Sequence, residues 1–293
     1  MVRGSSQSVA SAPSWAALRR LRRALITERP GDAFIKVILK GAFRVARDRG
    51  NPIRGNLFAG AMRELVTHVL HTLAPDRDVA ACDWYALQKD TKGPTRAQRA
   101  AYITHGGLLP KFVKDQLGLD PKETSKPLIE AMDRLNRLTH VKRDTVLSDG
   151  REIRRLAADA LDALLELFSS ARECRGEVER ELGSYVDQAV LDRLIGDVVQ
   201  ELDELSTHTQ IDEHQSEDIE VIEIGPTEIS FEVTGTVYVT LLYGSGSDRR
   251  RGDGAEIDDS YPYRAVVVSK AATPTVFSED AVTIEVDNSS FYE

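Results

Sequence analysis

The feature that most constrains this chain is a change in the spacing of its apolar residues near residue 215. Before that point, apolar side chains recur about every three to four residues, which is the spacing of helices packed on a core. After it, they alternate with polar side chains, as in strands that bury one face. A single change of period predicts an α+β fold, with an N-terminal all-α helical bundle followed by a small C-terminal antiparallel β domain.

The helical domain is expected over residues 13–207, after a disordered tail of small and polar residues at 1–12. Asp32 is a candidate N-cap of the second helix, and Pro75 follows the third. The spacing predicts helices at 14–26, 32–50, 51–75, 95–107, 120–140, 148–173 and 185–205.

The β domain is expected over residues 212–293. Alternating patterns predict its strands at 219–224, 230–243, 263–269 and 282–287. The stretch 244–260 is rich in Gly and Asp and is predicted to be a long loop. Its acidic residues could collect a cation, but the EF-hand pattern is absent and a solvated hairpin loop is the simpler interpretation. These acidic residues are Asp253, Glu256, Asp258 and Asp259.

The two halves of the chain carry opposite charge. Residues 1–150 hold 26 Lys and Arg against 15 Asp and Glu, a balance of +11, and the remainder holds 12 against 32, a balance of −20. A basic half can bind a polyanion such as RNA or DNA. The alternative is that the two halves attract each other or a second subunit.

Composition narrows the cellular setting. Two cysteines, Cys82 and Cys174, cannot build a disulfide framework, so a reducing, cytoplasmic location is expected. No apolar stretch is long enough for a signal peptide or a membrane span, so no membrane partner is expected. Cys82 lies two residues before Trp84, and a packing role is a simpler interpretation of it than a role as a nucleophile.

The first predicted helix is basic and amphipathic. Its apolar stripe includes Trp15 and Leu18, and its arginines lie mostly off that stripe. They can contact a phosphate backbone or simply form a solvated face. These arginines are Arg19, Arg20, Arg22 and Arg23.

The third predicted helix carries one carboxylate and two imidazoles on one face. Glu64, His68 and His71 are spaced by four and three residues, which places them within roughly 60° of each other on the helix. Such a group can bind a divalent metal, or a carboxylate can fix the tautomer of a histidine. The alternative is an ordinary polar flank. The sequence identifies neither a metal nor a cofactor.

The stretch "RLNRLTHVKRDT", residues 134–145, places two arginines and a histidine where a helix ends. Arg137 precedes His140 by three residues and lies near it, whereas Arg134 points to the other flank. A histidine can transfer a proton, and a guanidinium can hold the charge of a phosphate. The alternative is that His140 only complements the helix dipole. No phosphate-binding loop, dinucleotide motif or serine hydrolase motif is present.

Several segments resemble the predicted pPIWI-associating nucleases, a bacterial family assigned to anti-phage conflict systems. They are "MRELVTHVLHTLAPD", "CDWY", "TRAQRAAYITHGGL", "LNRLTHV", "VYVTLLYGSGSDRRRGDGAEIDDSYPY" and "VDNSSFYE". The resemblance spans most of residues 40–293. It implies a nuclease whose candidate site includes Arg63, Glu64, His68, His71 and His140.

The spacing from Arg134 to His140 also resembles the RNase motif of HEPN-type helical domains, which places Arg and His at a dimer cleft. Leu135 departs from that motif, which commonly has a polar residue after the arginine. This weaker resemblance implies a homodimer.

The resulting hypothesis is a bacterial nuclease, with RNA favoured over DNA. In it His140 is the acid/base, Arg137 or Arg134 stabilises the phosphorane, and Glu64, His68 and His71 orient, co-catalyse or bind metal. Arg63 and the arginines of the first helix would bind substrate. The alternative is a non-catalytic adaptor that grips nucleic acid or a defence-system protein, with the acidic β domain as its second interaction surface. A third hypothesis is a toxin silenced by that acidic domain.

Overall fold

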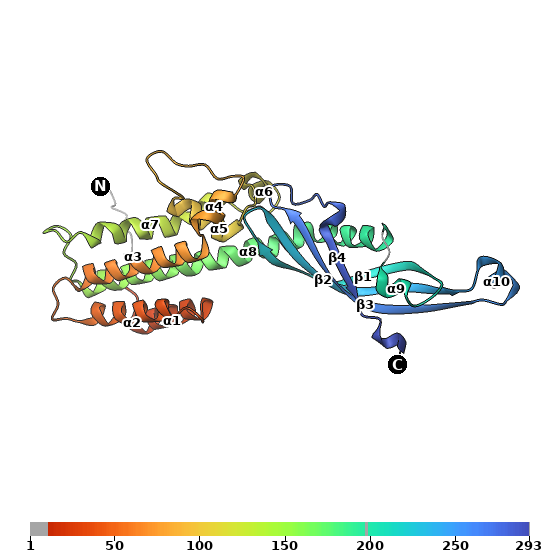
Figure 1. Cartoon of the computed structure of the whole chain (residues 1–293). Helices are drawn as coiled ribbons and strands as arrows, with labels where there is room; N and C mark the ends of the chain where they lie inside the picture. Colours follow the sequence, from red (N-terminus) through yellow and green to blue (C-terminus); the bar gives the residue numbers. More distant parts are fainter. Residues whose placement is uncertain (1–10, 197–198, 293) are drawn as a thin grey trace, which may run out of the picture. The chain divides into compact units, whose positions relative to one another are not determined.

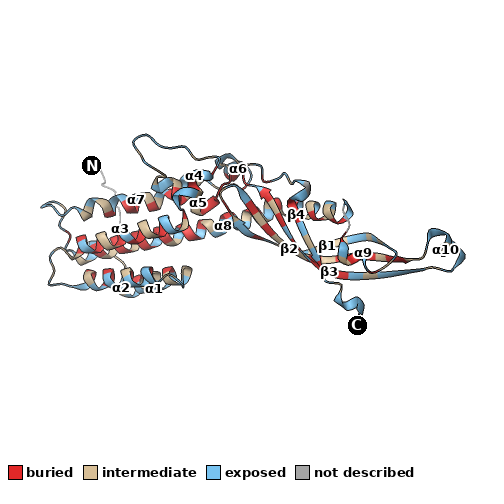
Figure 2. Ribbon diagram, in the orientation of Figure 1, coloured by how far each residue is buried: buried red, intermediate tan, exposed pale blue. Residues whose placement is uncertain are grey.

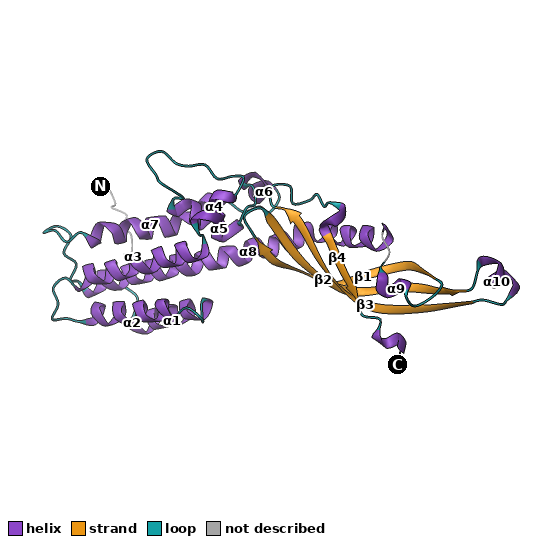
Figure 3. Cartoon of the chain, viewed as in Figure 1, coloured by secondary structure: helices purple, strands orange, loops and turns teal. Residues whose placement is uncertain are grey.

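A computed structural model describes residues 11–196 and 199–292 of the chain. The helices come first and a four-stranded antiparallel sheet follows, so the predicted α+β fold is confirmed (Figure 1, Figure 3). The prediction of a disordered tail falls mostly on residues 1–10, outside the described residues. No helix in the described ranges is long and apolar enough to cross a membrane.

The chain divides into two compact units. The first comprises residues 1–76, 87–104 and 120–171, and the second comprises 77–86, 105–119 and 172–293. The division falls inside a helix, between residues 171 and 172, and not between the helical and β domains expected at 13–207 and 212–293. Part of the helical sequence therefore belongs to the core of the sheet.

The first unit is a bundle of helices around one apolar core. Asp32 caps α2 as predicted, because its side chain accepts hydrogen bonds from the backbone amides of Phe34 and Ile35. The buried residues of these helices lie on their inward faces (Figure 2). Leu18, Phe58 and Leu135 are fully buried. The helices of this unit are α1 (Trp15–Glu28), α2 (Ala33–Arg47), α3 (Arg54–Leu73), α5 (Arg96–His105), α7 (Pro121–Thr139) and the first part of α8 (Gly150–Gly196).

A single helix, α8, spans the helix predicted at 148–173 and the first part of the one predicted at 185–205, and it ends at Gly196. The expectation of a break was wrong because the intervening segment contains no proline and its apolar residues keep the helical spacing. Its second part buries a stripe of residues four apart: Val178, Leu182, Val186, Val190 and Leu194. That stripe packs in the same core as the inward face of the sheet.

The sheet has the strand order β1-β2-β3-β4 with antiparallel neighbours throughout. Alternate residues of β2 are buried, including Phe231, Val233 and Val239, as the pattern predicted. The strands are β1 (His208–Ile224), β2 (Glu228–Tyr243), β3 (Ala255–Lys270) and β4 (Val282–Val286), and α10 (Gly246–Arg251) lies between β2 and β3. The predicted long loop is therefore shorter, because Asp258 and Asp259 already pair with β2.

Short helices complete the second unit. They are α4 (Asp76–Ala81), which continues from the first unit, α6 (Pro110–Asp115) and α9 (Gln200–Asp203). Gly106 and Gly107 end α5 as predicted, and their backbone lies against the turn between β1 and β2, where Gly107 donates to the carbonyl of Gly225 at 2.8 Å. A Cβ at Gly107 would lie 1.9 Å from the carbonyl oxygen of Pro226, so this close approach requires glycine.

Candidate functional site

His140 ends α7 and leaves its ring open. The residue is exposed, and its carbonyl accepts a hydrogen bond from the Thr145 hydroxyl at 2.7 Å. Arg137, one turn earlier, is also exposed. In the described part of the chain neither side chain forms a hydrogen bond or an ion pair. The imidazole and the guanidinium are therefore both available to a ligand.

Asn56, at the start of α3, fixes the loop that carries His140. Its side-chain amide donates to the carbonyls of Leu138 (2.8 Å) and Thr145 (2.7 Å), and its oxygen accepts from the amide of Leu147 (2.9 Å). The side chain is 3% exposed. Because it satisfies three backbone groups at once, Asn56 closes the loop between α7 and α8 into a defined shape.

The two residues before Asn56 hold the far end of the same loop. The Gly55 amide donates to the carbonyl of Leu147 at 3.0 Å, and a Cβ at Gly55 would lie 2.5 Å from that oxygen. Arg54 donates twice to the carbonyl of Ser148, at 2.7 and 3.2 Å. The tripeptide 54–56 therefore anchors residues 138–148 from beginning to end.

Arg63 connects the middle of α3 to the last turn of α7. Its guanidinium contacts Glu64 at 2.5 Å and donates to the hydroxyl of Thr139 at 3.5 Å. Thr139 directly precedes His140, so the structure brings Arg63 and Glu64 to the end of α7. Glu64 supplies the counter-charge that holds Arg63 there.

His68 is engaged elsewhere. Its Nε2 lies 2.7 Å from an oxygen of Asp32, and its ring lies 4.6 Å from the ring of Phe34. Burial alone raises the pKa of Asp32, but hydrogen bonds from His68 and from two backbone amides outweigh it and lower the pKa below its usual range. His68 therefore links α3 to the capped end of α2.

His71 has a third environment. Partial burial and the positive charge of Arg99 lower the pKa of His71, although the residue is exposed overall. Arg99 is itself buried and pairs with Asp76 at 2.5 Å. Glu64, His68 and His71 thus have three separate sets of neighbours. Across residues 11–196 and 199–292, no three His, Cys, Asp or Glu side chains are grouped so that they could hold a metal ion.

Arg134 and the arginines of α1 lie apart from this arrangement. Arg134 forms an ion pair with Asp159, which directs its guanidinium toward α8. Arg22 lies over the ring of Phe43 at 5.7 Å from its centre. The three other arginines of α1 are exposed: Arg19, Arg20 and Arg23.

The second unit contains a polar network that the sequence patterns did not single out. The hydroxyl of Ser216 donates to Asp187 at 2.6 Å and lies 3.0 Å from the hydroxyl of Tyr263. His214 places Nδ1 3.3 Å from that hydroxyl and Nε2 3.8 Å from Asp187. Burial raises the pKa of Tyr263, so its hydroxyl stays protonated at neutral pH. Each member of the network has a partner.

Bulges in β1 create this network. The pairing of β1 with β2 skips one residue after Ile211 and another after Ser216. A regular strand with Ile211 inward would point Glu213 inward, and the first bulge places His214 there instead. Opposite, a Cβ at Gly235 would lie 2.7 Å from the Tyr263 hydroxyl, so glycine makes room for it.

One further histidine and both cysteines are buried. Burial lowers the pKa of His105 to about 4, and its ring stacks edge-on against Trp84. Burial raises the pKa of Cys82 and of Cys174 to about 12, so neither thiol forms a thiolate near neutral pH. Their burial agrees with a packing role.

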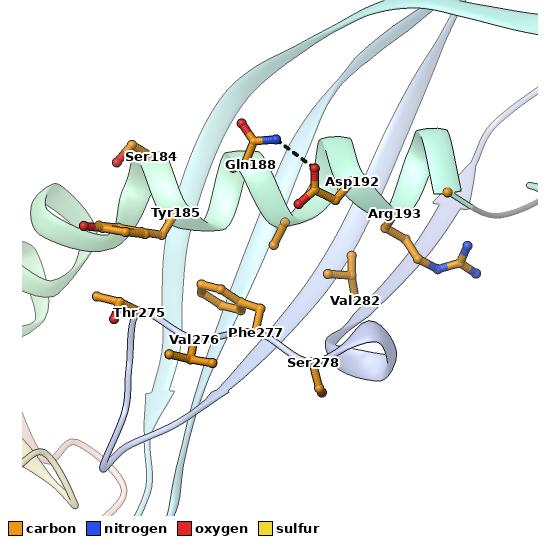
Figure 4. A pocket seen from close by; sticks show the side chains of 12 residues that line it. Ser184, Tyr185, Gln188, Asp192, Arg193, Thr275, Val276, Phe277, Ser278 and Val282 are labelled. Atoms are coloured by element: carbon orange, nitrogen blue, oxygen red, sulfur yellow. Dashed lines mark hydrogen bonds between the residues drawn. The ribbon is translucent and has the colours of Figure 1, made fainter.

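A hollow of about 850 Å³ lies between the end of α8 and the segment 275–282 (Figure 4). Tyr185 and Phe277 form part of its apolar wall, and Gln188 donates to Asp192 at 2.8 Å. The Asp192 carboxylate is therefore already hydrogen-bonded to the Gln188 amide, and the lining residues include no histidine. The hollow lacks the acid/base group that the end of α7 presents.

Comparison with protein families matches both parts of the chain. One model described as predicted pPIWI-associating nuclease matches residues 28–164, and a second with the same description matches residues 171–292. The boundary between them coincides with the division of α8 between the two compact units at residue 171. No curated protein and no solved structure matches the chain. Because the two matches together cover nearly the whole sequence, the chain belongs to the family of predicted pPIWI-associating nucleases.

Proposed function

We propose that this chain is a nuclease that cleaves RNA in preference to DNA and that its active site lies at the end of α7. The observation that carries the proposal is the open imidazole of His140 on a loop fixed by Asn56. An acid/base group must be accessible to substrate and held in place, and His140 meets both conditions. Family membership supports the reaction class.

The chemistry requires one proton carrier and positive charge. The imidazole of His140 takes the proton of a 2′-hydroxyl as its oxygen attacks the neighbouring phosphorus. The bond between phosphorus and the 5′ oxygen then breaks, which leaves a 2′,3′-cyclic phosphate, and the 5′ oxygen takes up the proton that His140 carries. Arg137 stabilises the charge on the phosphorane, and Arg63 adds to it from α3. Glu64 positions Arg63 beside the last turn of α7, whereas Asp159 holds Arg134 toward α8, so Arg134 has a smaller role.

The remaining residues act at a distance in this proposal. His68 joins α3 to α2 through Asp32, and His71 lies near Arg99 and Asp76, so neither histidine takes part in the reaction. The exposed arginines of α1, Arg19, Arg20 and Arg23, contact the backbone of bound RNA, while Arg22 packs on Phe43. A cytoplasmic location, a defence role alongside a partner protein, and a homodimer that closes a HEPN-like cleft are parts of the same proposal.

The test is cleavage of a labelled single-stranded RNA, and of DNA with the same sequence, by the full chain with and without chelator. We expect RNA cleavage to fall by about two to four orders of magnitude in His140→Ala. His208→Ala is the matched control, since it removes an exposed histidine of β1. If His140→Ala keeps full activity and only its melting temperature falls slightly, His140 stabilises the end of the helix and takes no part in catalysis. Loss of wild-type activity in chelator would require a metal that the proposal omits.

A non-catalytic adaptor is the second candidate, and the edge strand β1 favours it. Six acidic residues of this strand are exposed: Asp212, Glu213, Glu217, Asp218, Glu220 and Glu223. Ile222 lies among them and is 47% exposed. An acidic surface with an apolar centre fits a basic protein partner. RNA binding without cleavage of RNA or DNA by the wild-type chain would support this function over the nuclease.

A further inference from the structure

A basic hollow of about 510 Å³ lies in the first unit, where α2 ends and where α3 and α8 begin. It is distinct from the end of α7 and from the arginines of α1. Its principal side chains are one tryptophan and five arginines: Trp15, Arg47, Arg49, Arg54, Arg151 and Arg154.

The charge of this hollow is not balanced. Five arginines face one carboxylate, that of Asp149, so the lining carries a net +4. Asp149 already accepts a hydrogen bond from the backbone amide of Arg151 at 2.9 Å. None of the five arginines forms an ion pair with a described carboxylate, unlike Arg63 and Arg99 in the same unit. Like charges repel at short range, so such a cluster is favourable when an anion joins it.

Three of the arginines are held in place by groups other than acids. Arg54 donates to the carbonyl of Ser148, and Arg154 donates to the carbonyl of Pro13 at 2.8 Å. Arg47 lies over the ring of Trp15, 4.7 Å from its centre. These contacts fix the guanidinium groups and leave further N–H donors for a ligand.

Gly150 keeps the space between two of them open. A Cβ built at Gly150 would lie 3.4 Å from Nη2 of Arg54 and 3.6 Å from Nη1 of Arg154. Both guanidinium groups therefore flank the first turn of α8, whose backbone amides add partial positive charge. Any longer side chain at position 150 would enter the space that the two arginines share.

We propose that this hollow binds internal phosphates of a single-stranded polynucleotide. Arginines bind phosphate oxygens through pairs of N–H groups, and a backbone presents such phosphates in series. The loop from His140 to Asp149 joins the end of α7 to this hollow, so one strand can contact both. The inference rests on the proposed function only in treating the bound strand as substrate.

The first test is Gly150→Glu, measured as binding of a single-stranded, fully 2′-O-methylated RNA of about 12 nucleotides with a 5′-hydroxyl. This probe retains the phosphates and cannot be cleaved through its 2′ oxygen. The added carboxylate would occupy the two arginines without removing any donor. We expect at least about a tenfold loss of affinity, because a hydrogen bond to a charged group contributes that much or more. A helix start favours an acidic residue, so the melting temperature should not fall.

Gly41→Glu is the matched control, because Gly41 is an exposed glycine of α2 with open space around it. It adds the same charge to the same unit and should change affinity by less than about twofold. Equal losses in Gly150→Glu and Gly41→Glu would overturn the proposal, since they would show general electrostatics without a local site. Binding that requires a 5′-phosphate on the probe would also overturn the assignment to internal phosphates.

A second pair of variants keeps the proposal testable if Gly150→Glu is poorly folded. Arg49→Ala with Arg151→Ala removes two exposed hollow arginines, and Lys40→Ala with Arg44→Ala removes two exposed cations of α2 outside it. The first pair should lower the slope of log affinity against log salt by about 1.4, and the second should leave it unchanged. Unchanged slopes in both would overturn the site. These assays measure binding alone, because the probe cannot be cleaved. A chain that binds the probe through this hollow but cleaves no RNA would support this inference and contradict the proposed nuclease.

Discussion

The end of α7 and the network beneath the sheet use histidine in opposite ways. His140 is exposed and its ring has no partner among the described residues, whereas both ring nitrogens of His214 face partners, Tyr263 and Asp187. The loop around His140 is fixed through backbone groups that Asn56 binds. The comparison shows that partners, more than residue type, separate a side chain that can act on a ligand from one that holds the fold.

The largest expected effect comes from removing Asn56, which fixes the loop that carries His140. Asn56→Ala would leave two carbonyls and one amide of the loop without their partner, so we expect a loss of about 3 kcal/mol or more in the free energy of unfolding. RNA cleavage should fall with it, because His140 would no longer be held. Urea denaturation and cleavage rates measure both.

Asn136→Ala is the control, since the side chain of this α7 residue forms no hydrogen bond among the described residues and only its backbone carbonyl accepts one, from the Thr139 hydroxyl. It should change stability by less than about 0.5 kcal/mol. A loop that keeps its activity in Asn56→Ala would show that His140 needs no fixed support, and the comparison with His214 would lose its basis.

The sealed histidine of the second unit should give a pH-dependent stability. The pKa of His105 is about 4 in the folded chain, below the usual 6.5, because the ring is buried. Between these values the unfolded chain binds a proton that the folded chain does not, so stability rises with pH from about 4 to 6.5 and then levels. The expected rise from this residue is about 3 kcal/mol, at about 1.36 kcal/mol for each pKa unit.

His105→Phe should remove this rise, and His208→Ala, which changes an exposed histidine, should keep it. Chemical denaturation at several pH values between about 4 and 7 compares the two. An equally steep rise in His105→Phe would assign the pH dependence to other groups.

Tyr263→Phe tests the network in which His214 is paired. The change removes the hydroxyl that lies beside Ser216 and His214 and adds no volume, so a stability loss of about 1 to 2 kcal/mol is expected with RNA cleavage unchanged per folded molecule. Cleavage that disappears while stability stays constant would move the catalytic assignment from His140 to this network.

The smallest expected effect concerns Glu64. Its pair with Arg63 is largely exposed, so Glu64→Gln should change the free energy of unfolding by less than about 1 kcal/mol. The rate of RNA cleavage should fall less than in His140→Ala, because Glu64 only positions Arg63. A loss as large as that of His140→Ala would give Glu64 a direct part in the reaction.

The sequence predicts the fold wherever one periodicity dominates. The stripes of α2, α3 and α7 and the alternation of β2 appear in the structure as buried faces. The continuity of α8 was missed because its middle is polar on the surface while Cys174 and Val178 continue the buried stripe. The start of β1 was missed because its inward residues do not alternate regularly.

The candidate site was predicted less completely. Spacing on α3 placed Glu64, His68 and His71 on one face, but each side chain turns to a different neighbour, and those neighbours come from distant segments such as Asp32 and Arg99. The role of Asn56 depends on a loop more than 80 residues away. The pattern around a single helix contains no information about such contacts.

The bulges of β1 have a consequence for how this strand can change in length. The strand has 17 residues, but pairing with β2 uses 14 of them, and the three left over are Asp212, Glu217 and Ile222, each five residues after the last. On either side of each of these three residues, one neighbour points into the core and the other points to solvent. Deleting one of the three would therefore restore regular alternation and leave the same side chains on each face of the sheet. Deleting any residue between them would reverse the orientation of the adjoining segment. In related chains, gaps in this strand should therefore fall at a five-residue interval, where a residue can be gained or lost without exchanging the inside of the sheet for the outside.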